Sequence, residues 1–425
     1  MFRQLLQLFQ RKPTFAPYML SATGKIKPLE TRHQGIATLL AFALIPLSGF
    51  ATDIYIPSLP SMATSLKVSN LDVQFTLSLF LISYGVAQLF IGSIIDSFGR
   101  YKLSLACLLI FVISSVVIAE TDNLYLIYVM RIIHGITVAT IVVAKRAFFV
   151  DVYEGEQRKH YLSLFTIIWS SGPIIAPFIG GYLQTSFGWE SNFYFLAGLA
   201  TVLLVLEFLF SGETLRHFSD FQLRKIAAIY VEMIKTPSFS LGILMLGIAY
   251  CMIMVYNMTG PFIIEESLHL SPVVSGYCSL VLGFAWMVGG FAGKATIGKP
   301  FIPKMAFNIV LQMLFVLAMM ILLPLFHNLY TLVFFAFIIH VTAGYIFNNY
   351  FTFCLGRFPK NAGIAGGLTG GITYVIVSFL SYGIIAVLPA KDGVNLSYSY
   401  LILTVLAALV MFAVYRLTRK HEEAY

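Results

Sequence analysis

The chain has 425 residues, of which 59% are hydrophobic and only 11% are charged, and its formal net charge is +8. A soluble globular protein carries about 25% charged residues. This composition therefore excludes a soluble globular protein, including a soluble nucleic-acid-binding protein. The four cysteines lie in apolar runs without the spacing of metal ligands or of a disulfide framework. We therefore expect a membrane protein that has no bound metal or cofactor and no nucleic-acid partner.

Apolar runs long enough to cross a bilayer, which takes about 20 helical residues, recur along the whole chain. They do not alternate polar with apolar residues, so they predict helices rather than the strands of a barrel. The expected fold class is an all-α membrane protein with twelve transmembrane helices. In chain order, the spans are expected at 35–56, 75–95, 103–119, 124–149, 161–183, 192–210, 239–262, 272–293, 305–326, 330–354, 364–390 and 396–416.

Lysine and arginine are distributed unevenly between the two sides of these spans. Of the 27 such residues, Lys67 and Lys391 lie on one side, Arg131 lies within a span, and the others lie on the opposite side. Because cytoplasmic loops carry the excess of positive charge, both termini are expected in the cytoplasm, and the spans in a bacterial inner membrane. The expected organisation is a basic cytosolic tail at 1–33, a six-helix bundle at 34–210, a cytosolic linker at 211–238, a second six-helix bundle at 239–416 and a cytosolic tail at 417–425.

A weak internal repeat agrees with this division. Arg131-Ile-Ile-His134 in the fourth span corresponds to Phe337-Ile-Ile-His340 in the tenth. Duplicated halves are common among secondary transporters. The repeat predicts two pseudo-symmetric six-helix bundles.

The loop after the second span combines glycine, acid and arginine as Gly92-Ser-Ile-Ile-Asp96-Ser-Phe-Gly99-Arg100. It resembles the signature loop of the major facilitator superfamily. The resemblance implies that Gly92 allows close helix contact, that Gly99 permits a tight turn and that Asp96 pairs with Arg100 at the bilayer surface. A serine and a tyrosine stand where the family usually has basic residues, so a weaker contact is expected.

Three further stretches resemble the Bcr/CflA group of drug–proton antiporters in this superfamily. The residues that carry the resemblance are Asp53, Tyr55 and Pro57 in and just after the first span; Arg146 and Asp151 at the end of the fourth; and Gly172, Pro173, Pro177, Gly180 and Gly181 in the fifth. Arg131 also resembles the superfamily's pattern in the fourth span, where His134 replaces its usual glutamine. The resemblance implies a proton-coupled exporter that acts by alternating access. Proline bends a helix and small residues allow close helix packing, so the fifth span is expected to form a pliable seam between the bundles.

Ionisable residues within a bilayer are costly and usually functional. Asp53, Arg131 and His134 are the expected proton-coupling residues, with Asp53 linked to Arg131 directly or through water because both lie toward the outer side. Glu207 lies near the end of its span, where it is expected to reach water at the interface. An Arg and two His against one acid predict a neutral or anionic substrate rather than a polycation.

A substrate cavity is expected between the bundles near the membrane midplane. Its candidate lining residues are Tyr55, Tyr84, Gln88, Tyr256, Asn257, Trp286, His340, Asn348, Asn349 and Tyr350. The expected partners are a small-molecule substrate, protons and the lipid bilayer, and the functional unit is expected to be a monomer. A transporter for a siderophore or another carboxylate-rich metabolite, exporting or importing, stays open as an alternative, beside a channel or receptor. An enzyme is not expected, because no nucleotide-binding loop and no catalytic metal or nucleophile motif is present.

Overall fold

The computed structural model describes residues 27–215, 218, 223–358 and 362–422, and its secondary structure there is helical apart from a bridge between Pro28 and Glu213. Twelve of its helical stretches are long and apolar enough to cross a membrane. The predicted fold class and the number of spans are therefore confirmed. Most of the basic tail predicted at 1–33, part of the linker and the last residues of the C-terminal tail lie outside the described residues.

The first span is broken into short pieces. It consists of the single-turn helix η1 (Thr31–His33), α2 (Gln34–Leu44), α3 (Leu47–Asp53), the 3-10 turn η2 (Ile56–Ser58) and α4 (Leu59–Leu66). Prolines explain the breaks, because a proline has no N–H to donate and clashes with the preceding turn. Pro46 precedes α3 and Pro57 lies in η2. The broken span places Asp53 at a helix end inside the molecule.

The other spans of the N-terminal half are long single helices. They are α5 (Asn70–Phe98), α6 (Arg100–Glu120), α7 (Leu124–Val152), α8 (Gly155–Phe187) and α9 (Glu190–Phe210). Helix α5 begins with a capping box, in which Ser69 and Asp72 each accept a hydrogen bond from the other's backbone N–H. Asn123 caps α7 at the same end of the molecule.

The C-terminal half repeats this arrangement after a short linker helix, α10 (Leu223–Ile234). Its spans are α11 (Pro237–Phe262) with the π-helical turn η3 (Ile263–Ser267), α12 (Pro272–Ala295), α13 (Phe301–Leu322), α14 (Leu329–Arg357), α15 (Ala362–Val387) and α16 (Gly393–Glu422). Helix α10 lies against the N-terminal half, since the Tyr230 hydroxyl donates to the Leu89 carbonyl at 2.8 Å.

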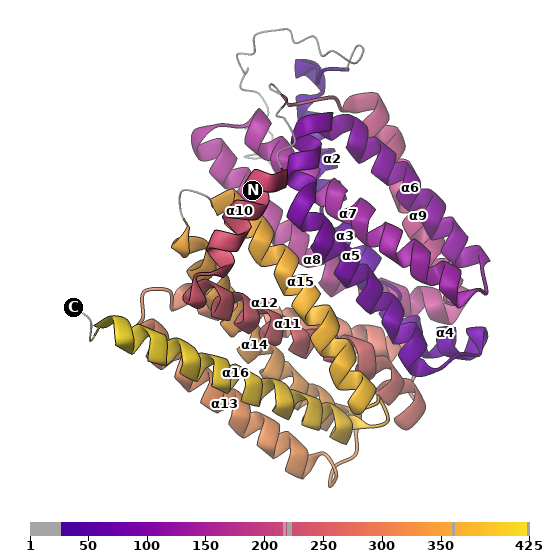
Figure 1. Cartoon of the computed structure of the whole chain (residues 1–425). Coiled ribbons are helices and arrows are strands. Elements are labelled where there is room, and N and C mark those ends of the chain that lie inside the picture. The colour runs from indigo at the N-terminus through magenta and orange to yellow at the C-terminus, as the bar shows by residue number, and fades with distance from the viewer. Residues whose placement is uncertain (1–26, 216–217, 219–222, 359–361, 423–425) are drawn as a thin grey trace, which may run out of the picture.

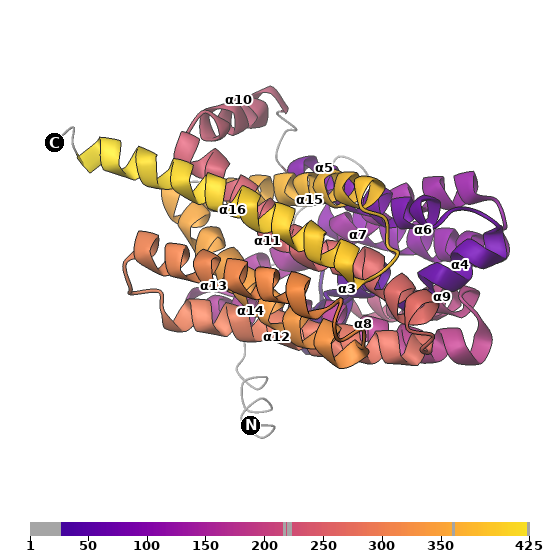
Figure 2. The ribbon, with the colours of Figure 1, turned by 90° about the horizontal axis from the view of Figure 1, so that it is seen from below.

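The helices gather in two groups that follow the two halves of the chain (Figure 1). Within the N-terminal half, α7 packs on α5 and α6, and α6 packs on α9; within the C-terminal half, α14 packs on α11 and α12, and α13 packs on α16. The halves meet mainly where α5 contacts α15 and where α8 contacts α12. Figure 2 shows α13 and α16 on the side of the molecule away from the N-terminal helices.

Small residues set the distance between the halves. A Cβ added at Gly85 of α5 would lie 2.6 Å from the Gly371 carbonyl of α15, and one added at Gly276 of α12 would lie 2.7 Å from the Pro177 carbonyl of α8. Helices in lipid pack closest through such positions, since apolar burial gives little driving force there. Both contacts between the halves are therefore backbone-to-backbone approaches.

Glu207 corrects a prediction. Its side chain is fully buried, and its carboxylate accepts a hydrogen bond from Lys145 of α7 at 2.7 Å. The interfacial position expected from its place in the sequence was wrong, because Lys145 lies inside α7 rather than in the following loop and reaches across to α9. The pair is held within the N-terminal half.

Candidate functional site

Arg131 lies in the interior of the N-terminal half and has no exposed surface. Its guanidinium carbon is 4.6 Å from the ring centroids of both Tyr55 and Phe80. One terminal nitrogen donates to the Ala51 carbonyl at 2.8 Å. Aromatic faces attract a desolvated cation by about 2 kcal/mol, so these rings and the carbonyl together hold the charge between the first span, α5 and α7.

Asp53 joins the two halves of the molecule. It is 1% exposed, and one of its carboxylate oxygens accepts a hydrogen bond from the Asn257 amide of α11 at 3.3 Å. The other oxygen is buried and has no hydrogen-bond partner among the described residues. Asp53 is therefore a buried acid that belongs to one bundle and is bonded by the other.

The two residues predicted to be linked, Asp53 and Arg131, are both described and form no ion pair with each other. Arg131 binds the backbone at Ala51, two residues before Asp53, while the Asp53 side chain turns toward Asn257. In this conformation Arg131 therefore contacts the first span close to Asp53 without pairing directly with its carboxylate, and the link through water stays a prediction.

The two predicted histidines lie inside separate bundles. His134 contacts the Ser115 hydroxyl at 3.1 Å and the Phe111 ring at 4.5 Å, both from α6. His340 contacts the Tyr400 hydroxyl of α16 at 3.3 Å, and the Tyr256 ring lies edge-on at 5.6 Å. His340 and Tyr256 thus pack within the C-terminal half, rather than facing the N-terminal half across the interface.

A row of aromatic rings crosses from one half to the other. The ring centroid of Tyr84 in α5 lies 4.8 Å from that of Tyr374 in α15. The Tyr374 centroid lies 5.7 Å from that of Tyr250 in α11, which lies 6.0 Å from that of Trp286 in α12. Trp286 in turn lies 5.1 Å from Phe347 of α14. We call these five residues the aromatic row. Sequence reasoning named Tyr84 and Trp286 but missed the other three, because a chain with 38 Phe and 23 Tyr offers no local signal for them.

The remaining cavity candidates are placed differently. Gln88 lies at the contact between α5 and α15, where its side-chain oxygen is 2.8 Å from a Cβ added at Gly370. Asn348 and Asn349 lie beside Gly293 of α12. The Tyr350 hydroxyl donates to the Met411 sulfur of α16 at 3.2 Å. Tyr350 therefore points into the C-terminal bundle.

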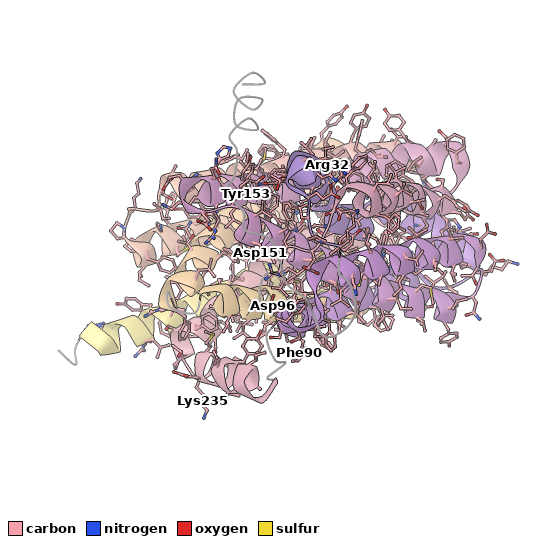
Figure 3. The ribbon with its side chains drawn as sticks, turned by 90° about the horizontal axis from the view of Figure 1, so that it is seen from above. Arg32, Phe90, Asp96, Asp151, Tyr153 and Lys235 are labelled. Carbon is pink, nitrogen blue, oxygen red and sulfur yellow. The ribbon has the colours of Figure 1, made fainter. Side chains whose placement is uncertain are left out.

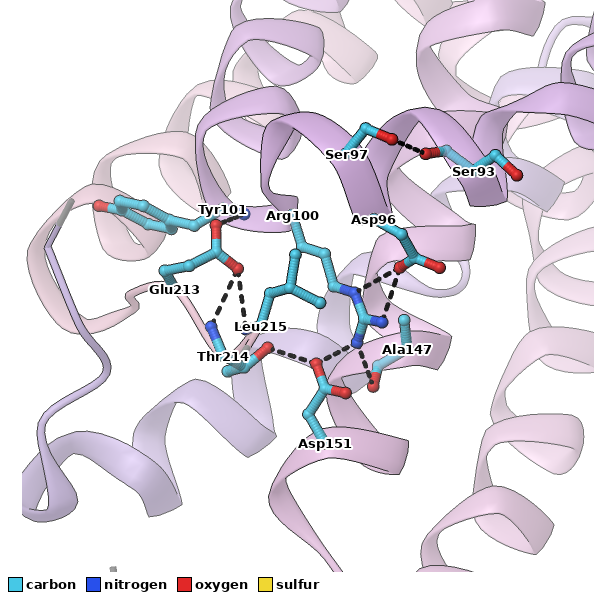
Figure 4. A network of polar contacts seen from close by, with 10 residues as sticks. All are labelled: Ser93, Asp96, Ser97, Arg100, Tyr101, Ala147, Asp151, Glu213, Thr214 and Leu215. Carbon is cyan, nitrogen blue, oxygen red and sulfur yellow. Dashed lines mark hydrogen bonds and ion pairs between the residues drawn. The ribbon is translucent and has the colours of Figure 1, made fainter. Parts of the chain in front are cut away.

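A polar network surrounds the signature loop (Figure 4). Arg100 pairs with Asp96 at 2.8 Å, pairs with Asp151 of α7 and donates to the Ala147 carbonyl at 3.1 Å. Figure 3 shows Asp96 and Asp151 lying near one another although they belong to different helices. Sequence reasoning proposed the contact between Asp96 and Arg100, while the structure adds Asp151 as the second acid that holds the arginine.

Two linker residues complete the network. Thr214 donates to Asp151 at 2.9 Å, and the Glu213 carboxylate accepts from the Tyr101 backbone N–H at 3.1 Å, which caps the start of α6. Gly99 has a φ of 95°, a conformation that favours glycine, and a Cβ there would lie 2.7 Å from Glu213. The sequence carries no local signal for Glu213, since it lies after the sixth span and more than 100 residues beyond the loop.

The structure contradicts the close helix contact that the family resemblance implies at Gly92. A Cβ added at Gly92 would meet no atom within 4 Å. The close helix contact expected there was wrong, because this face of α5 has open space beside it. Arg146, another residue of the family pattern, is exposed on α7.

Helix α8 lies between the first span and α12. A Cβ added at Gly172 would lie 2.7 Å from the Pro46 carbonyl, and one added at Gly180 would clash with the Ile54 carbonyl. On the opposite side, a Cβ at Gly181 would lie 2.6 Å from the Pro272 carbonyl. The Gly and Pro residues of the fifth span thus contact both neighbours through backbone.

Among the described residues, no group of three or more His, Cys, Asp or Glu side chains is placed to hold a metal ion. Twelve apolar spans in two halves, joined by a buried acid and an aromatic row, define a multi-pass membrane transporter. The chain belongs to the Major Facilitator Superfamily, whose model matches residues 41–382. That superfamily consists of transporters and not of enzymes.

Relatives and solved structures agree with this membership. Multidrug resistance protein D of Escherichia coli (strain K12) is 28% identical over 385 residues, which cover 89% of this chain and 95% of the relative. A bicyclomycin resistance protein homolog of Haemophilus influenzae is 31% identical over 179 residues, covering 42% of this chain and 44% of the relative. The structure of a bacterial homologue of the human lysosomal transporter Spinster matches with a TM-score of 0.71 at 16% identity, over 91% of this chain and 98% of that one.

Proposed function

We propose that the protein exports a small, largely apolar aromatic molecule in exchange for protons, by alternating access across a bacterial inner membrane. The observation that carries the proposal is the hydrogen bond from Asn257 to Asp53, which connects the two bundles through a group that binds a proton. The aromatic row crosses the interface between the same two bundles. The names of the two relatives, which refer to multidrug and bicyclomycin resistance, support drug export.

Asp53 is proposed as the proton carrier. A charged carboxylate is costly to bury unless its partners satisfy it, and Asp53 has one amide partner here. Proton binding would let Asp53 rest against Asn257, whereas proton release would draw it toward Arg131. The loss of the Asn257 contact would then free the two bundles to separate at this point.

Arg131 is proposed as the fixed charge of this exchange. The contacts with Tyr55, Phe80 and Ala51 hold its guanidinium in one place. A fixed cation near a mobile acid favours the charged form of that acid when the two approach. His134 contacts Ser115 and lies within hydrogen-bonding distance of Arg131 at 3.4 Å, so we propose that it orients the arginine.

The aromatic row supports an apolar aromatic substrate. Ligand pockets are lined mainly by apolar and aromatic side chains with a few polar groups that fix orientation, and Asp53, Asn257 and Gln88 supply such groups at this interface. The carboxylate-rich alternative needs a cation facing the substrate. Arg131, His134 and His340 are all buried against protein partners. They therefore present no positive charge to a substrate at the interface, and the excess of cations over acids no longer favours an anionic substrate.

Both termini are proposed to be cytoplasmic, and the functional unit is proposed to be a monomer. The orientation is supported by the distribution of Lys and Arg, which leaves Lys67 and Lys391 on the outer side. A site between two halves of one chain needs no second copy to complete it, which supports the monomer. We call the end of the molecule that holds Arg100 and Lys304 the basic end, and the end that holds Lys67 and Lys391 the outer end.

Transport in proteoliposomes with an imposed pH gradient tests the proposal. Chloramphenicol, as a neutral aromatic probe, should accumulate in response to the gradient with wild-type protein, and Asp53→Asn should abolish that response. Asp122→Asn, which changes an exposed acid at the outer end, is the matched control and should transport normally. Gradient-driven accumulation by the Asp53 variant would refute the coupling role, and transport of ferric citrate in place of the aromatic probe would favour the carboxylate-rich alternative.

A further inference from the structure

A pocket of about 390 Å³ opens at the basic end of the C-terminal half, away from the bundle interface. It lies between the turn after α12, the first residues of α13 and the last turns of α14. Its lining residues are Ile297, Phe301, Lys304, Asn349, Thr352, Phe353, Gly356 and Arg357. Nothing in the proposed transport mechanism uses this pocket.

The pocket carries two cations and no acid. Neither Lys304 nor Arg357 forms an ion pair with any described residue. Within the spans of this half, the acids Glu265, Glu266 and Asp392 lie at the outer end, and Glu422 ends α16 at the basic end without lining the pocket. Two cations that share a pocket repel each other, and no acid among the pocket's lining residues offsets their charge.

In the N-terminal half, the arginine at the corresponding end is neutralised by acids of the same half. There Arg100 lies between Asp96 and Asp151, and Asp151 belongs to the end of the fourth span. In the C-terminal half, the end of the corresponding span carries Arg357 where its counterpart carries an acid. The duplicated fold thus places an internally neutralised network at one loop and an unneutralised pair of cations at the other.

The walls of the pocket suit a phosphate with apolar chains attached. The Arg357 guanidinium carbon is 4.7 Å from the Phe353 ring centroid, and the Lys304 ammonium is 5.9 Å from that of Phe301. The Thr352 hydroxyl and the Asn349 amide are uncharged polar groups of the wall, and each donates to a backbone carbonyl of α14. The start of α13 has no side-chain cap, so its first N–H groups and its helix dipole also favour an anion there. Ile297 and the two rings give an apolar border.

We propose that this pocket binds the phosphodiester headgroup of an anionic phospholipid, with Lys304 and Arg357 as its two cations. Basic pockets between helices on the cytoplasmic side are suited to such headgroups. The leaflet named, the cytoplasmic one, rests on the proposed orientation of the chain. The pocket itself rests only on its residues, because it lies outside the proposed transport site.

Native mass spectrometry of the purified full-length protein tests this directly. Phosphatidylglycerol is titrated in detergent, and the bound molecules are counted with their dissociation constants. Lys304→Gln/Arg357→Gln should lose one tight site, with an affinity at least about tenfold weaker, as expected when two phosphate contacts are removed. Lys294→Gln/Lys299→Gln removes the same charge from exposed residues of the same end that do not line the pocket, and it should bind like wild type.

Further arms separate the possible sources of the anion. Lys304→Arg/Arg357→Lys keeps both charges and should retain the site, which rules out misfolding as the cause of a loss. Phosphatidylcholine and inorganic phosphate should each bind at least about tenfold more weakly than phosphatidylglycerol. An equal loss in both glutamine variants would show diffuse attraction to a basic surface, and equal binding of inorganic phosphate would show a soluble anion site; either result overturns the proposal. Asp53→Asn should bind the lipid normally, so a failure of the transport proposal leaves this test intact.

Discussion

Arg131 shows how far residue-level reasoning reaches in a membrane span. A buried arginine must have partners, because an unpaired charge in lipid is costly, and the sequence therefore predicted a partner for it. An acid at matching depth was the natural choice. In this conformation the guanidinium contacts His134, a backbone carbonyl and two ring faces. The carbonyl and the ring faces leave no signature in the sequence, and the link to Asp53 stays a prediction.

We expect Arg131→Lys to fail as a replacement. An ammonium group cannot stack flat between Tyr55 and Phe80 as a guanidinium does. The rate of gradient-driven transport should fall at least about tenfold, which corresponds to about 1.4 kcal/mol, and the protein should unfold at a lower temperature. Lys159→Arg, which changes an exposed cation of α8, is the control and should change neither. Wild-type transport by the Arg131 variant would show that charge alone suffices.

Lys145 and Glu207 give a residue-scale case in which reasoning from position failed. Each lies near the end of a predicted span, where a long side chain normally extends to the interface. Here both are buried, at 5% and 0% exposure, and they pair with each other. The pairing depends on how α7 and α9 face one another, which periodicity along either helix does not reveal.

Removing one member of the Lys145–Glu207 pair should strongly destabilise the folded protein. Removing one partner of a buried pair typically costs about 3–5 kcal/mol, whereas replacing both by apolar residues is often neutral. We therefore expect Glu207→Leu to lower the free energy of unfolding in detergent more than Lys145→Met/Glu207→Leu does. A double-mutant cycle on unfolding measures this. If the double variant were as unstable as the single one, the ion pair would not be the source of the cost.

At the scale of elements, α8 is the best-predicted part of the interface. Its Gly and Pro pattern indicated a close-packed, bendable span, and the structure places it between the first span and α12. The sequence could not name those neighbours. It also gave the same weight to Gly92, which has open space beside it, since a glycine has no side chain to indicate what it faces.

The close approach of α8 and α12 should be sensitive to single methyl groups. Gly276→Ala would press on the Pro177 carbonyl, so this conformation should lose population to one in which the halves separate at the outer end. Spin labels are placed at Lys67 and His327, which are exposed at the outer ends of opposite halves. Double electron–electron resonance should then report a longer distance between the two labels.

Gly92→Ala is the control for that measurement. It adds the same methyl group to a transmembrane helix, at a glycine with no neighbour within 4 Å. The distance distribution of this variant should match that of the unsubstituted protein. If both variants shifted it equally, the effect would belong to helix propensity rather than to the contact between α8 and α12.

For the whole molecule, the sequence predicted the number of spans and the family, because hydropathy and the loop motifs are local signals. Contacts between the halves are not local. The aromatic row brings together residues of α5, α11, α12, α14 and α15, and the capping of α6 by Glu213 joins segments more than 100 residues apart. Which face of each helix turns inward is decided by the packing of all twelve spans together.

Several hydrogen bonds join the halves toward the outer end. The Asn70 amide donates to Glu266 at 3.2 Å, Gln74 donates to the Met258 carbonyl at 2.6 Å, and Asn257 donates to Asp53. These contacts connect the first and second spans with α11 and η3. If transport requires the halves to part here, the contacts must break in every cycle.

A reversible cross-link across this end should therefore stop transport. In a protein whose four native cysteines are replaced by alanine, Asn70→Cys/Glu266→Cys is treated with a reducible bifunctional methanethiosulfonate. Transport should fall by at least about tenfold, since a two-state change is blocked when one state is locked, and dithiothreitol should restore it. Glu120→Cys/Tyr194→Cys is the matched control, because these residues are hydrogen-bonded at the same end but belong to α6 and α9 of a single half. Its cross-link should leave transport unchanged. Full transport by the Asn70–Glu266 cross-linked protein would mean that the outer end does not open and would remove alternating access from the mechanism.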